Sequence, residues 1–267
     1  MTLYEWTNTG SNDFYTRKLR VLATNDLPAE KWSSTGREDY NILKNYMRFP
    51  FEKLFDEKAD APETEKSFYI YEDENQACFD TGLFDKNWQH IYFYCKRNRN
   101  PDRQKYEFNG FYNEYTVKFL SIDATAVSSL RRPNYFGNPS ALIYDVNLSI
   151  IPQWQHIIYT EENFNRIPEP IRIMGPDMCR NVIAGSIETV QKRIQANYKT
   201  IVPQWFNKKI QLLAPLYLTN PNKPDLALVL SLSDDKTQYF GHTCLTTEMA
   251  YNNARLIARP ESYWLQP

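Results

Sequence analysis

Runs of apolar and aromatic residues typical of β-strands follow one another along this chain without helices between them. In the N-terminal half the runs are SFYIYE, HIYFYC, YEFNGFY and YTVKFLSI, at residues 67–72, 90–95, 106–112 and 115–122. Asparagine, aspartate, glycine and proline separate them. A parallel sheet needs a helix between successive strands, so this grouping favours an α+β fold whose sheets are mainly antiparallel.

Two stretches have the periodicity of helices. Apolar residues three and four positions apart predict a helix in residues 38–55 that Pro50 interrupts, and a charged loop after it, at 56–66. A longer apolar stripe begins after Pro176 and predicts the longest helix. Three strands and a short helix that Pro260 ends then complete the chain, at residues 210–218, 226–233, 239–246 and 247–258.

These elements predict one compact α+β domain over residues 1–267, with a few helices packed on the sheet. A boundary near residues 124–133 is compatible with the pattern, although no linker composition marks it. The stretch 133–176 is dense in proline and aromatic residues and predicts one or two short strands with long loops. The sequence contains no internal repeat.

The balanced charge and the low glycine content argue against a general attraction to polyanions and against a glycine-rich phosphate-binding loop. The chain has 31 Lys and Arg against 32 Asp and Glu, so its overall field does not attract polyanions, and any nucleic-acid binding must come from a local patch. Only eight glycines are present, and no P-loop, GxGxxG or GxSxG motif occurs. We therefore expect no cofactor.

The four cysteines lie far apart without a CxxC pair, and the N-terminus lacks the layout of a signal peptide. We therefore expect reduced thiols in a cytoplasmic protein. No apolar run approaches the roughly 20 residues that cross a bilayer, so no membrane association is expected. His90, His156 and His242 are scattered without the spacing of metal ligands, and we expect no metal site.

A basic loop lies between two of the expected strands. YCKRNRNPDRQK carries Lys96, Arg97, Arg99, Arg103 and Lys105 against Asp102 alone. Such a loop between strands with exposed tyrosines is typical of proteins that hold single-stranded nucleic acid, with bases stacked on rings and phosphates bound by cations. The alternative is an ordinary solvated hairpin loop.

A second group of cations is spread over the middle of the chain. Arg131 and Arg132 precede an aromatic stretch, and further basic residues follow at Lys192, Arg193, Lys199, Lys208 and Lys209. If these side chains converge, they form a pocket of the size of a phosphate. If they do not, they are surface charges.

The least helix-like part of the C-terminal helix is YNNAR, at residues 251–255. Two adjacent asparagines are poor helix formers, so Asn252 and Asn253 are candidates for specific hydrogen bonds. Arg255 could donate two parallel hydrogen bonds to a carboxylate or phosphate. Equally, the amides could hold proline-rich loops. Asp225 likewise either caps the start of an apolar strand or is an acid facing a site.

The C-terminal sequence resembles the OST-HTH-associated domain. The strings that carry the resemblance are IVPQWFNKKIQLLAPLYLTNPNKPDLALVL and YFGHTCLTTEMAYNNARLIARPESYWL, with ILKNYMRFPFEKL, the FDTGL turn before IYFYCKRN, and IETVQKRIQANYKTIVPQ upstream. Fusion of such domains to OST-HTH and cold-shock modules implies a role in RNA metabolism. Polar positions that match the pattern are Asn98, Lys199, Gln204, Asp225, Asn252, Asn253 and Arg255.

Three functions remain open from the sequence. The first is an RNA- or nucleotide-binding domain that uses the Lys96–Lys105 loop. The second is a metal-independent phosphodiesterase or nucleotide hydrolase, in which Lys199, Asn252 and Arg255 hold phosphate and Asp225 or Glu248 is the general base. The third is a protein-interaction module built on the aromatic stretch 133–176.

Overall fold

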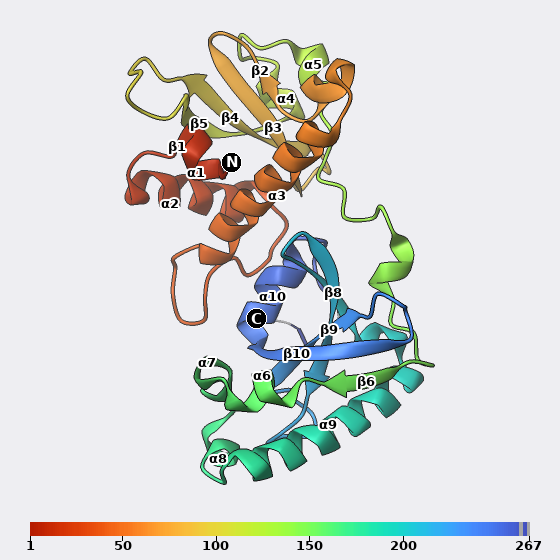
Figure 1. The fold of residues 1–267 in the computed structure, drawn as a ribbon. Coiled ribbons are helices and arrows are strands. Elements are labelled where there is room, and N and C mark those ends of the chain that lie inside the picture. Colours follow the sequence, from red (N-terminus) through yellow and green to blue (C-terminus); the bar gives the residue numbers. More distant parts are fainter. Residues whose placement is uncertain (262–263, 266–267) are drawn as a thin grey trace. The chain divides into compact units, whose positions relative to one another are not determined.

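The computed structural model describes residues 1–261 and 264–265 (Figure 1). The chain divides into two compact units, Met1–Asn134 and Tyr135–Pro267, and each contains its own five-stranded sheet. The division falls directly after residues 124–133. Strands are grouped in both units, and three of the four strand pairings in each sheet are antiparallel, so the α+β class predicted from the sequence is confirmed.

The N-terminal unit has the sheet order β1-β5-β4-β3-β2, with β1 parallel to β5 and the other pairs antiparallel. Its longest helix is α3. Its elements are α1 (Leu3–Trp6), β1 (Thr7–Asn8), α2 (Asn12–Val21), η1 (Leu22–Asp26), α3 (Asn41–Asp60), η2 (Glu63–Phe68), β2 (Tyr71–Glu72), β3 (Gln76–Phe84), β4 (His90–Arg97), β5 (Tyr106–Asn113), α4 (Glu114–Val117) and α5 (Ala124–Ser128).

The C-terminal unit has the sheet order β6-β10-β9-β8-β7, with β6 parallel to β10. Its longest helix is α9, which begins at Pro176 as the sequence predicts. Its elements are η3 (Pro139–Leu142), β6 (Ser149–Pro152), α6 (Trp154–Tyr159), α7 (Glu161–Phe164), α8 (Glu169–Arg172), α9 (Pro176–Ala196), η4 (Tyr198–Thr200), β7 (Val202–Phe206), β8 (Lys209–Leu216), β9 (Leu226–Leu232), β10 (Gln238–Thr246) and α10 (Thr247–Arg255).

The two units share one topology. In each, a first short strand is followed by helices, of which the last α-helix has 20 or 21 residues, then by a 3₁₀ helix, a four-stranded antiparallel meander and a helix. In each, the first strand lies parallel to the last strand of that meander. The sequence shows no repeat, so this recurrence is visible only in the order of strands and connections.

Helix α9 covers the core of the C-terminal unit. Its buried residues recur at three- and four-residue spacing, which places them on one face of the helix. They belong to one apolar cluster with buried residues of β8, β9 and β10: Ile183, Ile187, Val190, Ile194, Leu212, Leu228, Leu230 and Cys244. Burial of an aliphatic side chain contributes roughly 1.5–3 kcal/mol, so this face accounts for why the predicted helix forms.

The core of the N-terminal unit is aromatic. Phe79 of β3 and Phe93 of β4 are directly paired in the sheet, and their rings stack at 4.9 Å. Phe51 of α3 covers Phe79 at 5.3 Å. The expected interruption at Pro50 is wrong, because Pro50 lies buried inside the continuous helix α3 and its packing compensates for the one missing backbone hydrogen bond.

Two further local predictions for the N-terminal unit fail. Residues 56–66 are not a loop, since α3 continues to Asp60 and a 3₁₀ turn follows from Glu63. Residues 115–122 are not a strand, because Asn113 and Thr116 form a capping box that starts α4 instead. In the described part of the chain, no helix is long and apolar enough to cross a membrane.

Candidate functional site

A bulge in β3 positions a buried carboxylate. The pairing of β3 with β4 shifts register between Asp80 and Phe84, and Gly82 adopts the left-handed conformation there, with φ of 78°. The Thr81 hydroxyl donates to the carbonyl of Ile91 at 2.7 Å and accepts the Leu83 amide at 3.2 Å. The Gly82 amide donates to Oδ1 of Asp80 at 2.7 Å, so the bulge fixes this fully buried side chain.

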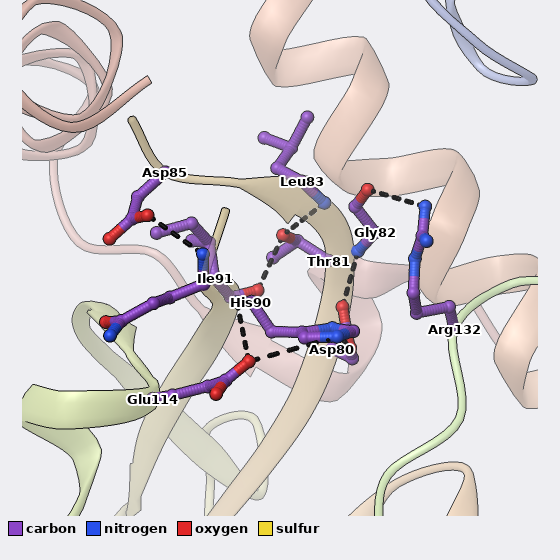
Figure 2. A network of polar contacts seen from close by, with 10 residues as sticks. Asp80, Thr81, Gly82, Leu83, Asp85, His90, Ile91, Glu114 and Arg132 are labelled. Atoms are coloured by element: carbon purple, nitrogen blue, oxygen red, sulfur yellow. Dashed lines mark hydrogen bonds and ion pairs between the residues drawn. The ribbon is translucent and has the colours of Figure 1, made fainter. Parts of the chain in front are cut away.

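Asp80 faces the first residue of β4. Its Oδ2 lies 2.5 Å from Nδ1 of His90, whose side chain is 31% exposed (Figure 2). On the other side of the ring, Oε1 of Glu114 accepts the backbone amide of His90 at 3.0 Å and lies 3.9 Å from Nε2. His90 is therefore held between a buried carboxylate and a partly exposed one.

These neighbours shift the ionisation of His90. The hydrogen bond that the ring donates to Asp80 raises the pKa of His90 above its ordinary value of 6.5, and the negative charges of Asp80 and Glu114 act in the same direction. Partial burial of the ring and the charge of Arg132 oppose the shift without cancelling it. These neighbours therefore favour the protonated imidazole of His90 more than solvent favours that of a free histidine.

A third carboxylate, that of Asp85, supports the position of Glu114. Oδ1 of Asp85 accepts the amides of Asn87 and Gln89, which closes the turn between β3 and β4. Oδ2 of Asp85 accepts a hydrogen bond from Nδ2 of Asn113 at 2.9 Å, and Asn113 caps the helix that Glu114 begins. The turn and the start of α4 are thereby tied together on both sides of His90.

Arg132 and two aromatic rings complete the surroundings of His90. The guanidinium of Arg132 donates to the carbonyl of Gly82 at 3.2 Å and lies 4.5 Å from the centre of the Phe84 ring. The same Phe84 ring meets the His90 ring edge-on at 4.8 Å. Trp88, in the turn, is 76% exposed and lies 6.0 Å from Phe84. Of the residues around His90, only Arg132 is a site residue predicted from the sequence.

The basic loop is the tip of the β4–β5 hairpin. Arg97 ends β4, and Asn98 closes the tip by donating its amide to the carbonyl of Lys105 at 3.0 Å. Among the described residues, no carboxylate forms an ion pair with Lys96, Arg97, Arg99 or Arg103, which are all exposed. Lys105 differs, because Glu72 binds it at 2.9 Å. Four cations thus remain available to an anion.

The tyrosines that flank this loop are not exposed, which corrects the expected stacking surface. Tyr92, Tyr94 and Tyr106 are buried in the sheet, where alternate residues face the core. The ring of Tyr106 is also occupied by cations, with Lys105 at 4.9 Å and Arg97 at 5.8 Å from its centre. Nucleobases therefore have no stacking surface on these three rings.

Two residues selected from the C-terminal sequence do contact each other. Nδ2 of Asn253 on α10 donates to Oε1 of Gln204 on β7 at 3.0 Å. Gln204 then donates to Gln211 at 3.0 Å, and Gln211 donates to the hydroxyl of Ser231 at 2.9 Å. This chain of amides crosses β7, β8 and β9, so the unusual asparagine fastens α10 to the sheet.

The remaining residues of the predicted phosphate site lie on different elements of the C-terminal unit. Lys199 is exposed in η4 and lines a groove of about 430 Å³ with Tyr198 and Arg259. Arg255 is half-buried at the end of α10. Oδ1 of Asn252 is buried and has no hydrogen-bond partner among the described residues. Asn252 and Arg255 lie on α10, whereas Lys199 lies in η4.

The two predicted general bases are placed differently. Both oxygens of Asp225 are occupied, since Oδ2 accepts the amides of Leu218 and Thr219 and Oδ1 accepts the Thr219 hydroxyl at 2.6 Å. These contacts are those of a cap for the loop before β9. Glu248 lies half-buried in the first turn of α10.

The second cationic group is divided between the units. Arg131 and Arg132 belong to the N-terminal unit, where Arg131 binds Glu65 at 2.8 Å. Lys192, Arg193, Lys199, Lys208 and Lys209 belong to the C-terminal unit. Arg193 contacts the Tyr217 ring at 3.9 Å and the carbonyl of Pro221 at 2.6 Å, so it serves packing within that unit.

The described residues contain neither a cluster of metal ligands nor a disulfide. Within them, no group of three or more His, Cys, Asp or Glu side chains is arranged to hold a metal ion. The four cysteines, Cys78, Cys95, Cys179 and Cys244, are buried and do not pair as disulfides. Burial raises the pKa of each thiol, which disfavours the reactive thiolate.

Fold and site define an α+β chain of two topologically equivalent units, the first of which holds a histidine between two carboxylates. Residues 24–264 match the model of a domain of unknown function, DUF3825, and the chain belongs to that family. Neither a curated protein nor a solved structure matches the chain.

Proposed function

We propose that the N-terminal unit binds RNA or a nucleotide through the tip of the β4–β5 hairpin, and that the protein acts in RNA metabolism in the cytoplasm. The observation that carries this proposal is the set of four exposed cations, Lys96, Arg97, Arg99 and Arg103, without a carboxylate partner among the described residues. Each cation that meets a phosphate releases condensed counterions, which gives affinity without sequence recognition.

The surroundings of the tip define what kind of binding to expect. The net charge of the whole chain is −1, so no long-range field assists association. The nearby tyrosines are buried, so stacking contributes little there. We therefore expect modest affinity that depends strongly on salt and weakly on base sequence.

The resemblance to the OST-HTH-associated domain supports the same proposal. It is most specific in the C-terminal strings at residues 201–230 and 239–265, and it implies a role in RNA metabolism. The match to the DUF3825 family model gives membership of that family but no function. The RNA role is therefore a proposal that rests on the hairpin first and on the resemblance second.

The test is RNA binding by a double variant of the hairpin. Fluorescence anisotropy with a labelled single-stranded RNA would measure the affinity at several salt concentrations. For Arg97→Ala/Arg99→Ala we expect weaker binding and a slope of log K against log salt that is shallower by about 1.4, or about 0.7 per lost phosphate contact.

The matched control is Arg20→Ala/Arg37→Ala, which removes two exposed arginines of the same unit away from the hairpin. It changes the net charge by the same amount. Because it removes no cation of the hairpin, it should keep the wild-type slope of log K against log salt. Equal losses of RNA affinity in the two double variants would show a general charge effect. Unchanged affinity in the hairpin variant would show that the tip does not bind RNA.

A protein-interaction module is the alternative that the aromatic stretch 133–176 suggested. In this stretch Phe136, Ile143 and Tyr159 are exposed apolar side chains. Their exposure is compatible with an interface but does not identify a partner. Binding of RNA to the hairpin would not exclude this second role.

A further inference from the structure

The two atoms that face each other beside the His90 ring are spaced to hold one hydroxyl group. Nε2 of His90 and Oε1 of Glu114 are 3.9 Å apart, too far for a direct hydrogen bond. A single oxygen can lie at about 2.8 Å from both atoms, because that triangle closes. A hydroxyl placed there has one hydrogen, which it donates to Nε2 of the neutral ring or to the carboxylate oxygen of Glu114.

Asp80 prepares His90 for such a group. Its Oδ2 accepts the Nδ1–H of the ring when His90 is neutral, which leaves a lone pair on Nε2 that can accept a hydrogen bond. Once Nε2 takes a proton, the fully buried Asp80 carboxylate stabilises the imidazolium at 2.5 Å. The Gly82 amide in turn holds Asp80, so the bulge of β3 serves this geometry.

The same surroundings contain groups for an anion and for a flat ring. Arg132 and His90 both contact the ring of Phe84, which brings a guanidinium close to the imidazole. A guanidinium binds phosphate in a bidentate manner. Trp88, beside Phe84, offers a mostly exposed ring on which a base can stack. Here, unlike at the basic tip, an aromatic surface is accessible.

We propose that this cluster is a catalytic site that cleaves RNA by activating a ribose 2′-hydroxyl. His90 takes the proton of the 2′-hydroxyl at Nε2 while the 2′ oxygen forms a bond to the adjacent phosphorus and the bond from phosphorus to the 5′ oxygen breaks. The leaving 5′ oxygen takes a proton from water. The products are a 2′,3′-cyclic phosphate and a 5′-hydroxyl, and His90 returns its proton to solvent.

RNA fits the cluster because it carries the nucleophile and the electrophile in one group. No further reactant has to enter, and Arg132 offsets the charge that develops on the phosphate oxygens. The choice of substrate rests on the proposed RNA binding, whereas the catalytic geometry does not depend on the hairpin. His90 lies at the start of β4 and Arg97 at its end, roughly 23 Å away at 3.3 Å per residue.

Cleavage is measured with the full-length protein on two substrates, a labelled single-stranded RNA and a dinucleoside monophosphate that does not need the hairpin. The 2′-deoxy analogue of each is the negative control, because it lacks the nucleophile. We expect a cyclic phosphate product from both RNA substrates and none from the analogues. His90→Gln should lower the rate about 100-fold or more, and His156→Gln, at an exposed histidine of the other unit, should not.

Asp80→Asn separates a positioning role from a purely structural one. The charged groups that face His90 are Asp80 on β3, Glu114 on α4 and Arg132 after α5. The wild-type rate should rise with pH as His90 becomes neutral. Without the Asp80 charge the midpoint of this pH profile should move to lower pH, because the imidazolium loses its main stabilisation.

Three results would overturn the proposal. The first is intact RNA after incubation with wild type from pH 5 to 9, and RNA binding measured in the same samples would still support the proposed function. The second is wild-type cleavage by His90→Gln. The third is equal cleavage of the 2′-deoxy analogue. Cleavage of the dinucleotide without binding of the longer RNA would instead contradict RNA binding by the hairpin and would support the catalytic site at His90.

Discussion

Nδ2 of Asn253 on α10 donates a hydrogen bond to Oε1 of Gln204 on β7, whose side chain is almost fully buried. The bond joins the last described helix to the edge of the C-terminal sheet. Asn253 is a poor helix former, so its presence in α10 is explained by this contact and not by local propensity.

Asn253→Ala should destabilise the protein by about 1–3 kcal/mol, because it leaves a buried acceptor on Gln204 without a partner. Gln204→Leu removes that acceptor, so the double variant should lose less than the sum of the single losses. Urea unfolding of the wild type and the three variants would measure the coupling. Strictly additive losses would show that the hydrogen bond contributes nothing.

Gly82→Ala should be more destabilising than Gly36→Ala. Both glycines have positive φ, at 78° and 74°, so both substitutions carry a backbone strain of roughly 1–2 kcal/mol. A Cβ at Gly82 also lies 3.0 Å from the Tyr46 hydroxyl, whereas a Cβ at Gly36 meets nothing within 4 Å. Thermal unfolding of the two variants would compare them, and equal losses would show that Tyr46 moves aside without penalty.

Glu72 should make the stability of the protein sensitive to acid. Burial alone would raise the pKa of Glu72, but the hydrogen bonds and charges of Lys58 and Lys105 outweigh it and lower that pKa to about 2. A lowered carboxyl pKa stabilises the folded state above the unfolded value of 4.5, and this stability is lost as pH falls toward 2.

Glu72→Gln should therefore lose stability at pH 6 and show a weaker decline between pH 4.5 and 2.5 than wild type. Urea unfolding across that range gives the comparison. Glu63→Gln is the matched control, since Glu63 pairs with Lys66 on the surface and contributes little. A Glu72 variant that follows the wild-type curve would contradict the assignment.

His90 should have the opposite pH dependence. Its pKa is raised in the folded state, so it adds stability below the unfolded value of 6.5, and this contribution disappears as pH rises through the folded pKa. The free energy of unfolding of wild type relative to His90→Gln should thus be largest below pH 6.5 and shrink as pH rises above it. A constant difference would show that Asp80 does not favour the imidazolium.

Removal of residues 1–23 should prevent the N-terminal unit from folding cooperatively, although the family match begins only at residue 24. The removed segment contains β1 and several buried side chains: Leu3, Trp6, Tyr15, Leu19 and Leu22. Each such loss costs roughly 2–5 kcal/mol. Amide hydrogen exchange in β5 should accelerate, and unchanged protection there would contradict the prediction.

Elements whose pattern is local were predictable. Helix α9 follows from its apolar stripe, and β9 and β10 follow from short apolar runs between turn residues. Strand β3 was missed because Asp80, Thr81 and Gly82 interrupt its apolar pattern and read as a turn. Those residues form a bulge whose polar groups are satisfied only by the neighbouring strand.

The cluster of Asp80, His90 and Glu114 could not be predicted from the sequence, because its contacts also form only between neighbouring elements of the fold. Asp80 and His90 are ten residues apart and meet only across the β3–β4 hairpin, so a search for metal-ligand spacing does not connect them. Glu114 joins them through the cap at Asn113, directly before residues 115–122, where a strand was expected. Gln204 and Asn253, selected for their positions in the sequence, meet as structural partners.

The parallel pairing of each first strand with each last strand imposes an order on synthesis. Thr7 of β1 pairs with Tyr106 of β5, and Ser149 of β6 pairs with Gln238 of β10. On a translating ribosome, each nascent unit must keep its opening strand unpaired until its closing strand has left the exit tunnel. The N-terminal unit can then complete its sheet while the chain that forms β10 is still being made.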